Sequence, residues 1–370
     1  MSIDMIMISE WKKRYGYLPW LISIFLFFCI TFGEGLNESN SAWSAQKDGV
    51  QSNGAVQKKF PAPNEFRNAL RIAYEKYKDI TEGKNADYIP YLAKVDPGLY
   101  GIVIVTVDGD VYEIGDSKYH FAIESISKVF TLCRVIQDMG VRAIEEKIGV
   151  NATGLPFNSV TAIELHEART VNPFVNAGAM ATVSLVKGET SDARWNKIIG
   201  TMNSFAGRSL RVNKDVYRSE SKTNIHNHAI VLLLKSYGRF YDNPSETLDL
   251  YTRQCSVAVS ARDLAVMGAT LANGGTNPVT KKRVIDESYV PKVLALMMTN
   301  GLYEASGEWV YRTGLPGKSG VGGGILAIVP GKFAIAAFSP PLDEAGNSVR
   351  GQKAIEYISE TLRANLFSIP

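Results

Sequence analysis

The chain has 370 residues, 45% of them hydrophobic and 21% charged, which is the composition of a globular protein with a large core rather than of a disordered or fibrous one. There are 40 Lys and Arg residues against 37 Asp and Glu residues, which gives a net charge of +3. This excess of positive charge is too small to predict binding to a nucleic acid. Three cysteines without a CxxC pair and four histidines without an HExxH motif predict neither a disulfide framework nor a zinc site.

The N-terminal 33 residues have the character of a targeting segment. A basic patch at 12–14 precedes an apolar run at 18–32 and a polar stretch with small residues at 42–45, which is the order of a secretory signal. The apolar run is intermediate in length, so residues 1–33 are predicted to be either a signal peptide or a membrane anchor. The protein is accordingly expected to be periplasmic or secreted, with membrane contact if the anchor is kept; a start assigned too far upstream of a cytoplasmic protein is the alternative. Residues 34–62 are polar and aperiodic and are predicted to be a linker.

Two hairpins are predicted, one near each end of the folded body. The first joins Gly101–Val107 to Val111–Ile114 through an Asp-Gly turn, and the second joins Ile325–Val329 to Phe333–Phe338 through a Pro-Gly turn. An antiparallel sheet built from both the N-terminal and the C-terminal segments is therefore expected.

The stretch between the hairpins has a helical pattern. Apolar residues recur three and four positions apart, and Gly or Asn at 139–140, 273–275 and 300–301 stand where helices end. A last amphipathic helix is expected at 353–362. These patterns predict an α/β fold in which the sheet is packed with helices and carries an inserted all-helical subdomain. The expected division of the body, residues 63–370, is a sheet part at about 63–125 and 310–370 and a helical part at about 126–309.

The first motif that carries chemistry is Ser125-Ile126-Ser127-Lys128. A serine and a lysine three positions apart on a helix share one face, about 5–6 Å apart at Cβ. The pattern S-x-x-K also begins at Ser9, Ser44, Ser184 and Ser219, so it is weak by itself. Only the motif at Ser125 follows a hairpin and opens a strongly apolar helix, whose free N–H groups would favour a developing oxyanion. An N-cap serine beside a solvated lysine remains the alternative for this motif alone.

A second motif, Lys318-Ser319-Gly320, lies just before a glycine run that leads into a predicted strand. S-x-x-K followed far downstream by K-[ST]-G is the signature of serine acyl-enzymes of the penicillin-recognising type. The third element of that group is missing, because Tyr251-Thr252-Arg253 has the tyrosine of Y-x-N without its asparagine. Such an assignment also leaves the motif at 172–179, and Glu220 seven residues before Asn227, without a role.

Ten segments in order resemble the serine-dependent glutaminases, a family with a fold like that of β-lactamases and penicillin-binding proteins. Among them are FAIESISKVFTL (121–132), NPFVNAGA (172–179), LYTRQCSV (250–257) and GLPGKSGVGGGI (314–325). The ten segments cover about 64–365, essentially the whole body, and are far more specific than S-x-x-K alone.

The resemblance implies hydrolysis of L-glutamine to L-glutamate and ammonia, with no metal or organic cofactor, by a homodimer or homotetramer. It makes Ser125 the nucleophile, Lys128 its activating partner and Tyr251 a proton relay to the leaving ammonia. The backbone N–H groups of Ser125 and Val321 would form the oxyanion hole. The side chains that match the positions holding glutamine are those of Tyr88, Asn176, Glu220, Asn227 and Tyr303.

Elementary chemistry agrees with these roles. A side-chain amide is a poor electrophile, so a serine activated by a desolvated, neutral lysine must attack it while two N–H donors stabilise the tetrahedral oxygen. By charge, Glu220 suits the α-ammonium group of glutamine, and Asn176 and Asn227 suit its α-carboxylate and amide.

Glu124 departs from the family pattern, which usually has glutamine before the nucleophile. A carboxylate there is expected to weaken binding of the substrate's own carboxylate or to have a raised pKa, unless it turns outward or pairs with a cation. Cys133 and Cys255 are expected to be buried free thiols, with a redox-sensitive pair as the alternative. His226 and His228 are expected to be hydrogen-bonded structural residues rather than metal ligands.

Two other functions remain open from the sequence. One is a penicillin-interacting hydrolase or transpeptidase, which an export signal would suit. The other is a catalytically inactive module that senses glutamine, whose mark would be a lost nucleophile or lysine; both residues are present.

Overall fold

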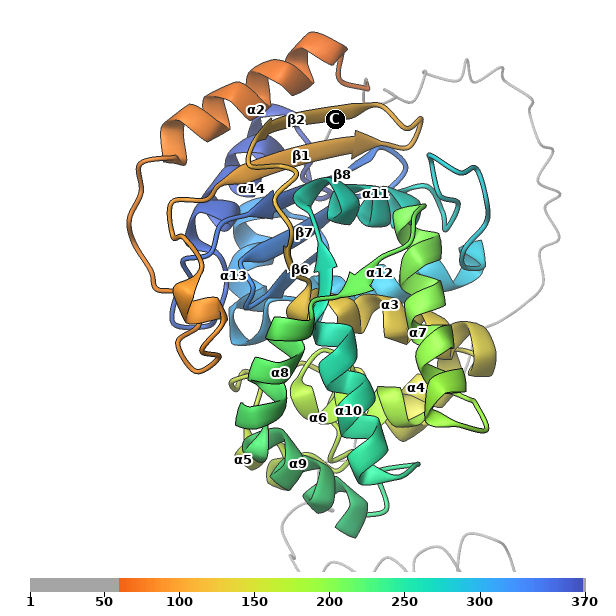
Figure 1. Cartoon of the computed structure of the whole chain (residues 1–370). Helices are drawn as coiled ribbons and strands as arrows, with labels where there is room; N and C mark the ends of the chain where they lie inside the picture. The colour runs from red at the N-terminus through yellow and green to blue at the C-terminus, as the bar shows by residue number, and fades with distance from the viewer. Residues whose placement is uncertain (1–59, 369–370) are drawn as a thin grey trace, which may run out of the picture. The chain divides into compact units, whose positions relative to one another are not determined.

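The computed structural model describes residues 60–368, so the predicted signal peptide or anchor lies outside the described residues, as does nearly all of the predicted linker. A five-stranded sheet with the strand order β2-β1-β8-β7-β6 lies at the centre of the described chain (Figure 1), and every neighbouring pair of strands is antiparallel. The five strands are β1 (Gly101–Thr106), β2 (Val111–Gly115), β6 (Gly317–Gly320), β7 (Gly324–Val329) and β8 (Phe333–Phe338).

Both predicted hairpins are confirmed, and the sheet is built from both ends of the body. The register pairs Ile102 with Ala337 and Ile104 with Ile335. Because successive strand residues point to opposite faces, Ile102 and Ile104 join one core while Val103 and Val105 join the other. Both faces are covered, which explains why β7 and β8 are apolar along their whole length.

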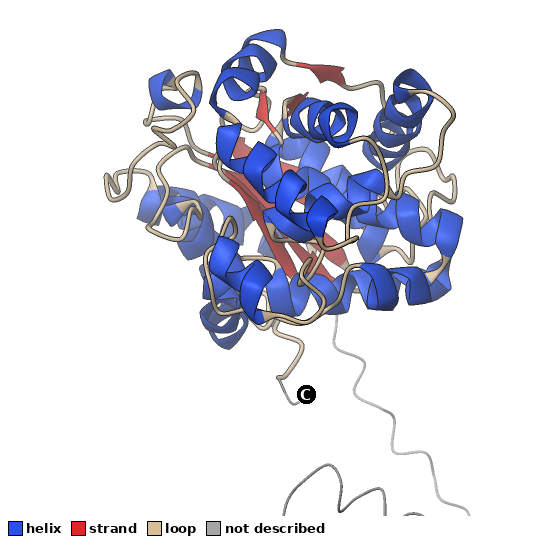
Figure 2. Ribbon diagram, turned by 90° about the horizontal axis from the view of Figure 1, so that it is seen from below, coloured by secondary structure: helices blue, strands red, loops and turns tan. Residues whose placement is uncertain are grey.

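Helices cover both faces of the sheet (Figure 2). Helices α2 (Pro63–Tyr77) and α14 (Val349–Thr361) pack on one face, and α11 (Ala261–Ala272) packs on the other. None of the helices within residues 60–368 is both long enough and apolar enough to span a membrane. The other helices are α3 (Ser127–Met139), α4 (Val141–Lys147), α5 (Val160–Leu165), α6 (Asn176–Ser184), α7 (Ser191–Ala206), α8 (Lys214–Thr223), α9 (Ile225–Ser236), α10 (Pro244–Cys255), α12 (Val290–Asn300) and α13 (Ser306–Thr313), with 3₁₀ turns η1 (Leu92–Lys94), η2 (Glu124–Ile126), η3 (Glu287–Tyr289) and η4 (Tyr303–Ala305).

The three predicted helix ends are confirmed. Helix α3 ends at Met139 before Gly140, α11 ends just before Asn273, and α12 ends at Asn300. The last helix begins at Val349, four residues earlier than expected, because the Ser348 side chain caps its N-terminus.

The inserted part is helical except for a small second sheet, which the expectation of an all-helical subdomain missed. Its strands are β3 (Phe121–Ala122), β5 (Val257–Val259) and β4 (Arg211–Val212), in the order β3-β5-β4. Strands of two or three residues are too short to produce an alternating pattern, so the sequence carries no signal for them.

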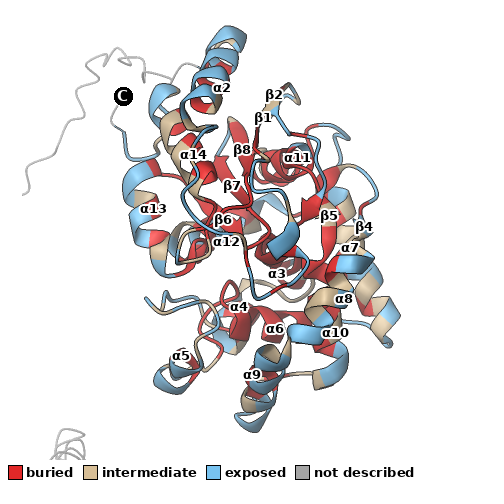
Figure 3. Ribbon diagram, turned by 60° about the vertical axis from the view of Figure 1, so that its left-hand side comes forward, coloured by how far each residue is buried: buried red, intermediate tan, exposed pale blue. Residues whose placement is uncertain are grey.

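Helix α3 differs from its predicted form in two ways. It begins at Ser127, and Ser125 lies in the preceding 3₁₀ turn η2 rather than in the α-helix. The apolar residues of this helix are buried as expected, and Lys128 is buried with them, because the first turns of the helix run through the interior (Figure 3).

Gly200 inside α7 and Gly207 at its C-terminal cap allow a paired test of how backbone conformation affects stability. Gly200 lies inside the helix with open space around it, so Gly200→Ala should raise the free energy of unfolding by about 0.5–1 kcal/mol. Gly207 caps the same helix with a φ of +69°, so Gly207→Ala should lower it by about 1 kcal/mol. Urea unfolding followed by circular dichroism measures both. Equal shifts in the same direction would contradict this assignment of the helix and its cap.

Candidate active site

The turn that carries Ser125 is fixed by the small sheet. Phe121 pairs with Val259, and the backbone N–H of Ile123 donates to the carbonyl oxygen of Val257 at 2.9 Å. The Phe121 ring also stacks on Phe338 of the main sheet, with 4.1 Å between ring centroids. Because β5 directly follows α10, this pairing ties the Ser125 turn to the helix that carries Tyr251.

The glycines after Lys318 allow the backbone of that segment to pack closely against the Ser125 turn. A Cβ on Gly320 would lie 2.8 Å from the carbonyl oxygen of Ile123, and a Cβ on Gly322 would collide with the carbonyl oxygen of Ala122. The Val321 side chain packs in one apolar cluster with Ala122. The loop that follows β6 is thereby held against the turn.

Lys128 is buried without an acidic hydrogen-bond partner. Its Nζ donates to the carbonyl oxygen of Phe174 at 3.1 Å and to Oδ1 of Asn176 at 2.8 Å. Burial lowers the pKa of Lys128 to about 8, against the opposing influence of Cys255 and Glu124. A large share of the amine is therefore neutral near pH 8, as a general base requires.

The NPFVNAGA motif builds the acceptors for Lys128. The side chain of Asn172 accepts hydrogen bonds from the N–H groups of Phe174 at 2.9 Å and Val175 at 3.2 Å, which closes the predicted Asn-Pro turn. Helix α6 then begins at Asn176. The turn thus presents the Phe174 carbonyl and the Asn176 side chain to the same amine.

Asn176 is hydrogen-bonded to three other predicted site residues, Lys128, Tyr251 and Asn227. Its Oδ1 also accepts from the Tyr251 hydroxyl at 3.1 Å, and its Nδ2 donates to Oδ1 of Asn227 at 2.9 Å. Burial, followed by the nearby Cys255, raises the pKa of Tyr251 well above its usual value, so this phenol stays protonated. The structure therefore brings Lys128, Asn176, Tyr251 and Asn227 into one hydrogen-bonded network.

Two carboxyl groups meet on another side of the site. One oxygen of Glu124, one oxygen of Glu220 and the Cys255 sulfur all lie within 4.8 Å of one another. Burial raises the pKa of Glu124 to about 7, although the contact with Glu220 and the charge of Lys128 lower it. The Glu124 side chain turns inward and lies beside a second acid rather than pairing with a cation, and this burial favours the raised pKa that the sequence predicts.

Tyr303 lies close to Ser125. Its phenol is beside the hydroxyls of Ser125 and Ser319, and burial raises its pKa. The Lys318 amine is 4.1 Å from the centre of the Tyr303 ring and donates to the carbonyl oxygens of Gly301 and Ser319. Burial and the charge of Lys128 lower the pKa of Lys318 well below its usual value.

Tyr88 forms part of the rim of the site. About half of its surface is exposed, at 53%, yet loss of water at the phenol, followed by the charges of Glu124, Tyr303 and Glu220, raises its pKa. Tyr88 is thus near both carboxyl groups. All the side chains predicted to hold a substrate gather around Ser125 and Lys128.

Some neighbours of the site were not assigned to it from the sequence. Cys255 lies one helical turn after Tyr251, and its sulfur is 3.9 Å from the hydroxyl of Ser127. Lys318 was recognised in the K-S-G motif but received no role. The spacing of Cys255 from Tyr251 on one helix was the signal that could have placed the thiol here.

The remaining sequence expectations concern thiols and histidines. Cys133 and Cys255 are both free and buried, as expected. His226 is hydrogen-bonded to the carbonyl oxygen of Asn158 at 2.8 Å, which agrees with its structural interpretation. The only potential metal-ligand group found within residues 60–368 is the Glu124, Glu220 and Cys255 cluster.

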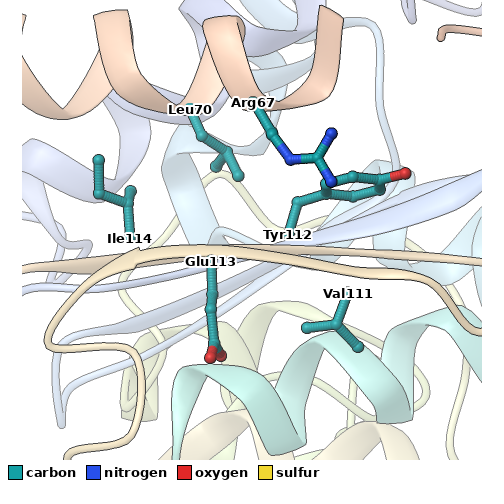
Figure 4. A pocket seen from close by; sticks show the side chains of 6 residues that line it. All are labelled: Arg67, Leu70, Val111, Tyr112, Glu113 and Ile114. Carbon is teal, nitrogen blue, oxygen red and sulfur yellow. The ribbon is translucent and has the colours of Figure 1, made fainter. Parts of the chain in front are cut away.

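A separate hollow lies between α2 and β2, where the Arg67 guanidinium covers the ring of Tyr112 and Val111 and Glu113 point to the opposite side of the strand (Figure 4). Strand β2 is one edge of the sheet and β6 is the other. None of the site residues lines this hollow.

Comparison with known proteins identifies the class as an amidohydrolase. The model of the glutaminase family matches residues 83–367. A glutaminase of Colwellia psychrerythraea is 56% identical over 309 residues, which cover 84% of this chain and 99% of that protein. Among solved structures, the probable glutaminase YbaS has 51% identity and a TM-score of 0.82, with 84% of this chain and 100% of that chain covered. The probable glutaminase of Bacillus subtilis has 28% identity and a TM-score of 0.75, with coverages of 82% and 97%. The chain belongs to the glutaminase family.

The burial of Lys128 leads to a prediction for the catalytic step. If the neutral amine acts as the base, kcat should rise with pH through about 8 as the proton leaves. Lys128→Met keeps the length of the side chain without the amine and should lower kcat for amide hydrolysis at least a hundredfold. Lys187→Met is the matched control, because Lys187 stands in another S-x-x-K motif and its amine is 3.5 Å from the carbonyl oxygen of Asp138. Equal loss in both variants, measured as ammonia release across pH 6–10, would remove Lys128 from the role of base.

Proposed function

We propose that the protein hydrolyses L-glutamine to L-glutamate and ammonia through an acyl-enzyme on Ser125. The observation that carries the proposal is the buried Lys128 amine, three residues after Ser125, with two neutral oxygen acceptors and a pKa of about 8. Residues at i and i+3 across a 3₁₀ turn lie on the same side of it, so the amine and the hydroxyl share one side of the site.

The reaction has two halves. Lys128 takes the proton of the Ser125 hydroxyl, whose oxygen attacks the side-chain amide carbon, and the N–H groups of Ser125 and Val321 stabilise the oxygen of the tetrahedral intermediate. Tyr251 then passes a proton to the nitrogen and is reprotonated from Lys128, the carbon–nitrogen bond breaks, and ammonia leaves. A water molecule gives a proton to Lys128 and attacks the resulting ester; the bond to Ser125 breaks, Lys128 returns the proton to the serine oxygen, and glutamate and the free serine result.

The charges of the site support the orientation of the substrate. Glu220 is the acid suited to the α-ammonium group, and the amides of Asn176 and Asn227 are suited to the other polar groups of glutamine, with Tyr88 and Tyr303 completing the enclosure. A solved structure titled as Mglu in its glutamate form has 35% identity to this chain and a TM-score of 0.78, with 84% of this chain and 71% of that chain covered. Binding of an amino acid of this type is therefore proposed here too.

Ser125→Ala in the full chain tests the proposal. Ammonia release from L-glutamine should fall to background, while the thermal unfolding midpoint changes by a few degrees at most, because loss of a hydroxyl in a first turn costs about 0.5–2 kcal/mol even where it caps. Ser184→Ala and Ser219→Ala, from other S-x-x-K motifs, are the controls and should remain active. An active Ser125→Ala variant beside an inactive control would refute the assignment.

The same preparations separate the two rival functions. A penicillin-interacting hydrolase would turn over a chromogenic cephalosporin that the glutaminase leaves intact. A glutamine-sensing module would bind L-glutamine without releasing ammonia even as the wild type.

Glu220→Gln tests the ammonium site. The substitution removes a buried carboxylate partner of a cation, so kcat/KM for L-glutamine should fall at least about thirtyfold. Glu304→Gln changes an exposed acid next to Tyr303 and should leave kcat/KM within about twofold. If the Glu220 variant behaves like the Glu304 variant in steady-state ammonia release, Glu220 has no part in binding.

Two properties outside the chemistry are also proposed. The protein self-associates as a dimer or tetramer, which is supported by exposed apolar side chains on α5 and α9, among them Leu165, Ile225 and Leu232. It is exported to the periplasm or beyond and is membrane-anchored if its N-terminal segment is not cleaved, which is supported by the basic patch and the apolar run of residues 12–32.

A further inference from the structure

The carboxyl groups of Glu124 and Glu220 form a buried acid pair, although 96 positions along the chain, from residue 124 to residue 220, separate them. Glu124 belongs to η2 and is 3% exposed, and Glu220 approaches it from α8. Each carboxyl has one oxygen, Oε1, that is shielded from solvent and has no hydrogen-bond donor from elsewhere in the described protein. Each of these oxygens is a hydrogen-bond acceptor without a donor, and a proton or a bound cation would satisfy it.

Lys128 of α3 is the cationic group that acts on Glu124 through its charge, and Lys318 interacts electrostatically with Lys128 and with the neighbouring Cys255. The hydrogen bonds of the Lys128 amine go to Phe174 and Asn176, not to either acid. The other titratable groups facing the pair are the thiol of Cys255 and the phenols of Tyr88, Tyr251 and Tyr303, all of which remain neutral near pH 7 because their pKa values are raised. The pair therefore has no bonded counter-ion from the protein.

Two buried carboxylates in contact cannot both be ionised without a counter-ion, because each negative charge disfavours the other and neither is solvated. One proton shared between them relieves the repulsion and supplies the missing hydrogen bond. The pKa of Glu220 is raised well above its usual value by burial and by Glu124, and that of Glu124 is raised to about 7 by burial, which agrees with one retained proton at neutral pH.

We propose that Glu124 is a specificity-determining residue: it shares one proton with Glu220 in the free enzyme, and the α-ammonium group of the substrate binds at the pair by displacing that proton. The inference rests on the proposed function and deepens it. The charges balance, because a singly protonated pair of charge −1 becomes a dianion of charge −2 paired with an ammonium of charge +1, and one proton passes to the solvent.

This exchange has two consequences for recognition. Protons and the substrate ammonium compete for the same two carboxyls, so affinity for L-glutamine should rise as pH increases through the titration of the pair. A ligand whose α-amino group is acylated cannot displace the proton, so the pair selects free α-amino acids over glutamine side chains within a peptide.

The first experiment measures the proton directly. Isothermal calorimetry of L-glutamine binding to the Ser125→Ala full chain, in two buffers of different ionisation enthalpy at pH 6.5–7, should report release of close to one proton. Adding Glu124→Gln should reduce the release to less than half a proton, because an amide can neither share nor lose it. Adding Glu304→Gln instead should leave the release unchanged.

The second experiment follows kcat/KM from pH 5 to 9 with catalytically intact enzyme. Lys128, with a pKa of about 8, titrates on the same acid limb, so the slope identifies the pair: below about pH 7 the logarithm of kcat/KM should rise by about two per pH unit in the wild type and in Glu304→Gln, and by about one in Glu124→Gln. The pH profile tests the shared proton even if the Ser125→Ala variant binds L-glutamine too weakly for calorimetry.

Equal proton release with and without Glu124→Gln, or acid limbs of equal slope for wild type and Glu124→Gln, would overturn the inference. Loss of the proton release in Ser125→Ala/Cys255→Ser, with the slope of the acid limb unchanged by Glu124→Gln, would assign the proton to the thiol instead. Failure of the proposed function looks different, because the wild type would then release no ammonia from L-glutamine at any pH.

Discussion

The burial of an amine without an acidic hydrogen-bond partner is the constraint on which the site depends. Lys128 lies in the first turns of α3, where every residue is buried, and its Nζ is held by a carbonyl and an amide oxygen rather than by a carboxylate. A bonded carboxylate would raise the pKa of the amine and keep it protonated, whereas neutral acceptors leave desolvation as the dominant influence. The neighbouring elements α6 and α10 are organised around this amine, because Asn176 accepts from both Lys128 and Tyr251.

In this site the amines of Lys128 and Lys318 interact with each other, and the carboxyl groups of Glu124 and Glu220 lie together. The hydrogen bonds of both amines go to neutral oxygens and not to a carboxylate. The charge of Lys128 lowers the pKa of Lys318, and Glu124 raises the pKa of Glu220. Direct ion pairs would have neutralised these charges within the protein and left none for a substrate that itself carries both signs. The arrangement costs stability but leaves proton acceptors and donors available near neutral pH, as acid–base chemistry requires.

Backbone geometry at the site is as unusual as its charges. Glu124 and Tyr303 are non-glycine residues with φ values of +50° and +57°, in the left-handed region that most side chains avoid. Each of these side chains is directed into the site, beside Glu220 and Ser125 respectively. Strained residues persist only where the surroundings determine them fully, and here the surroundings are β3, β5 and the close backbone of Gly320 and Gly322.

The sequence by itself determined the two hairpins, the helix ends at Met139 and Asn300 and the glutaminase-type motifs, because turn dipeptides, caps and ordered motifs are local signals. Desolvation of Lys128 was expected only from the chemistry that fits the family resemblance, because the motif alone left a solvated lysine as the alternative. Only the tertiary structure decided that Glu124 faces Glu220, that Cys255 joins them, and that Lys318 lies over Tyr303. The tertiary structure also revealed the small sheet β3-β5-β4, because its strands are too short to show an alternating pattern in the sequence. These contacts join residues tens to hundreds of positions apart, and a local pattern carries no information about which distant side chain will share a buried, low-dielectric space.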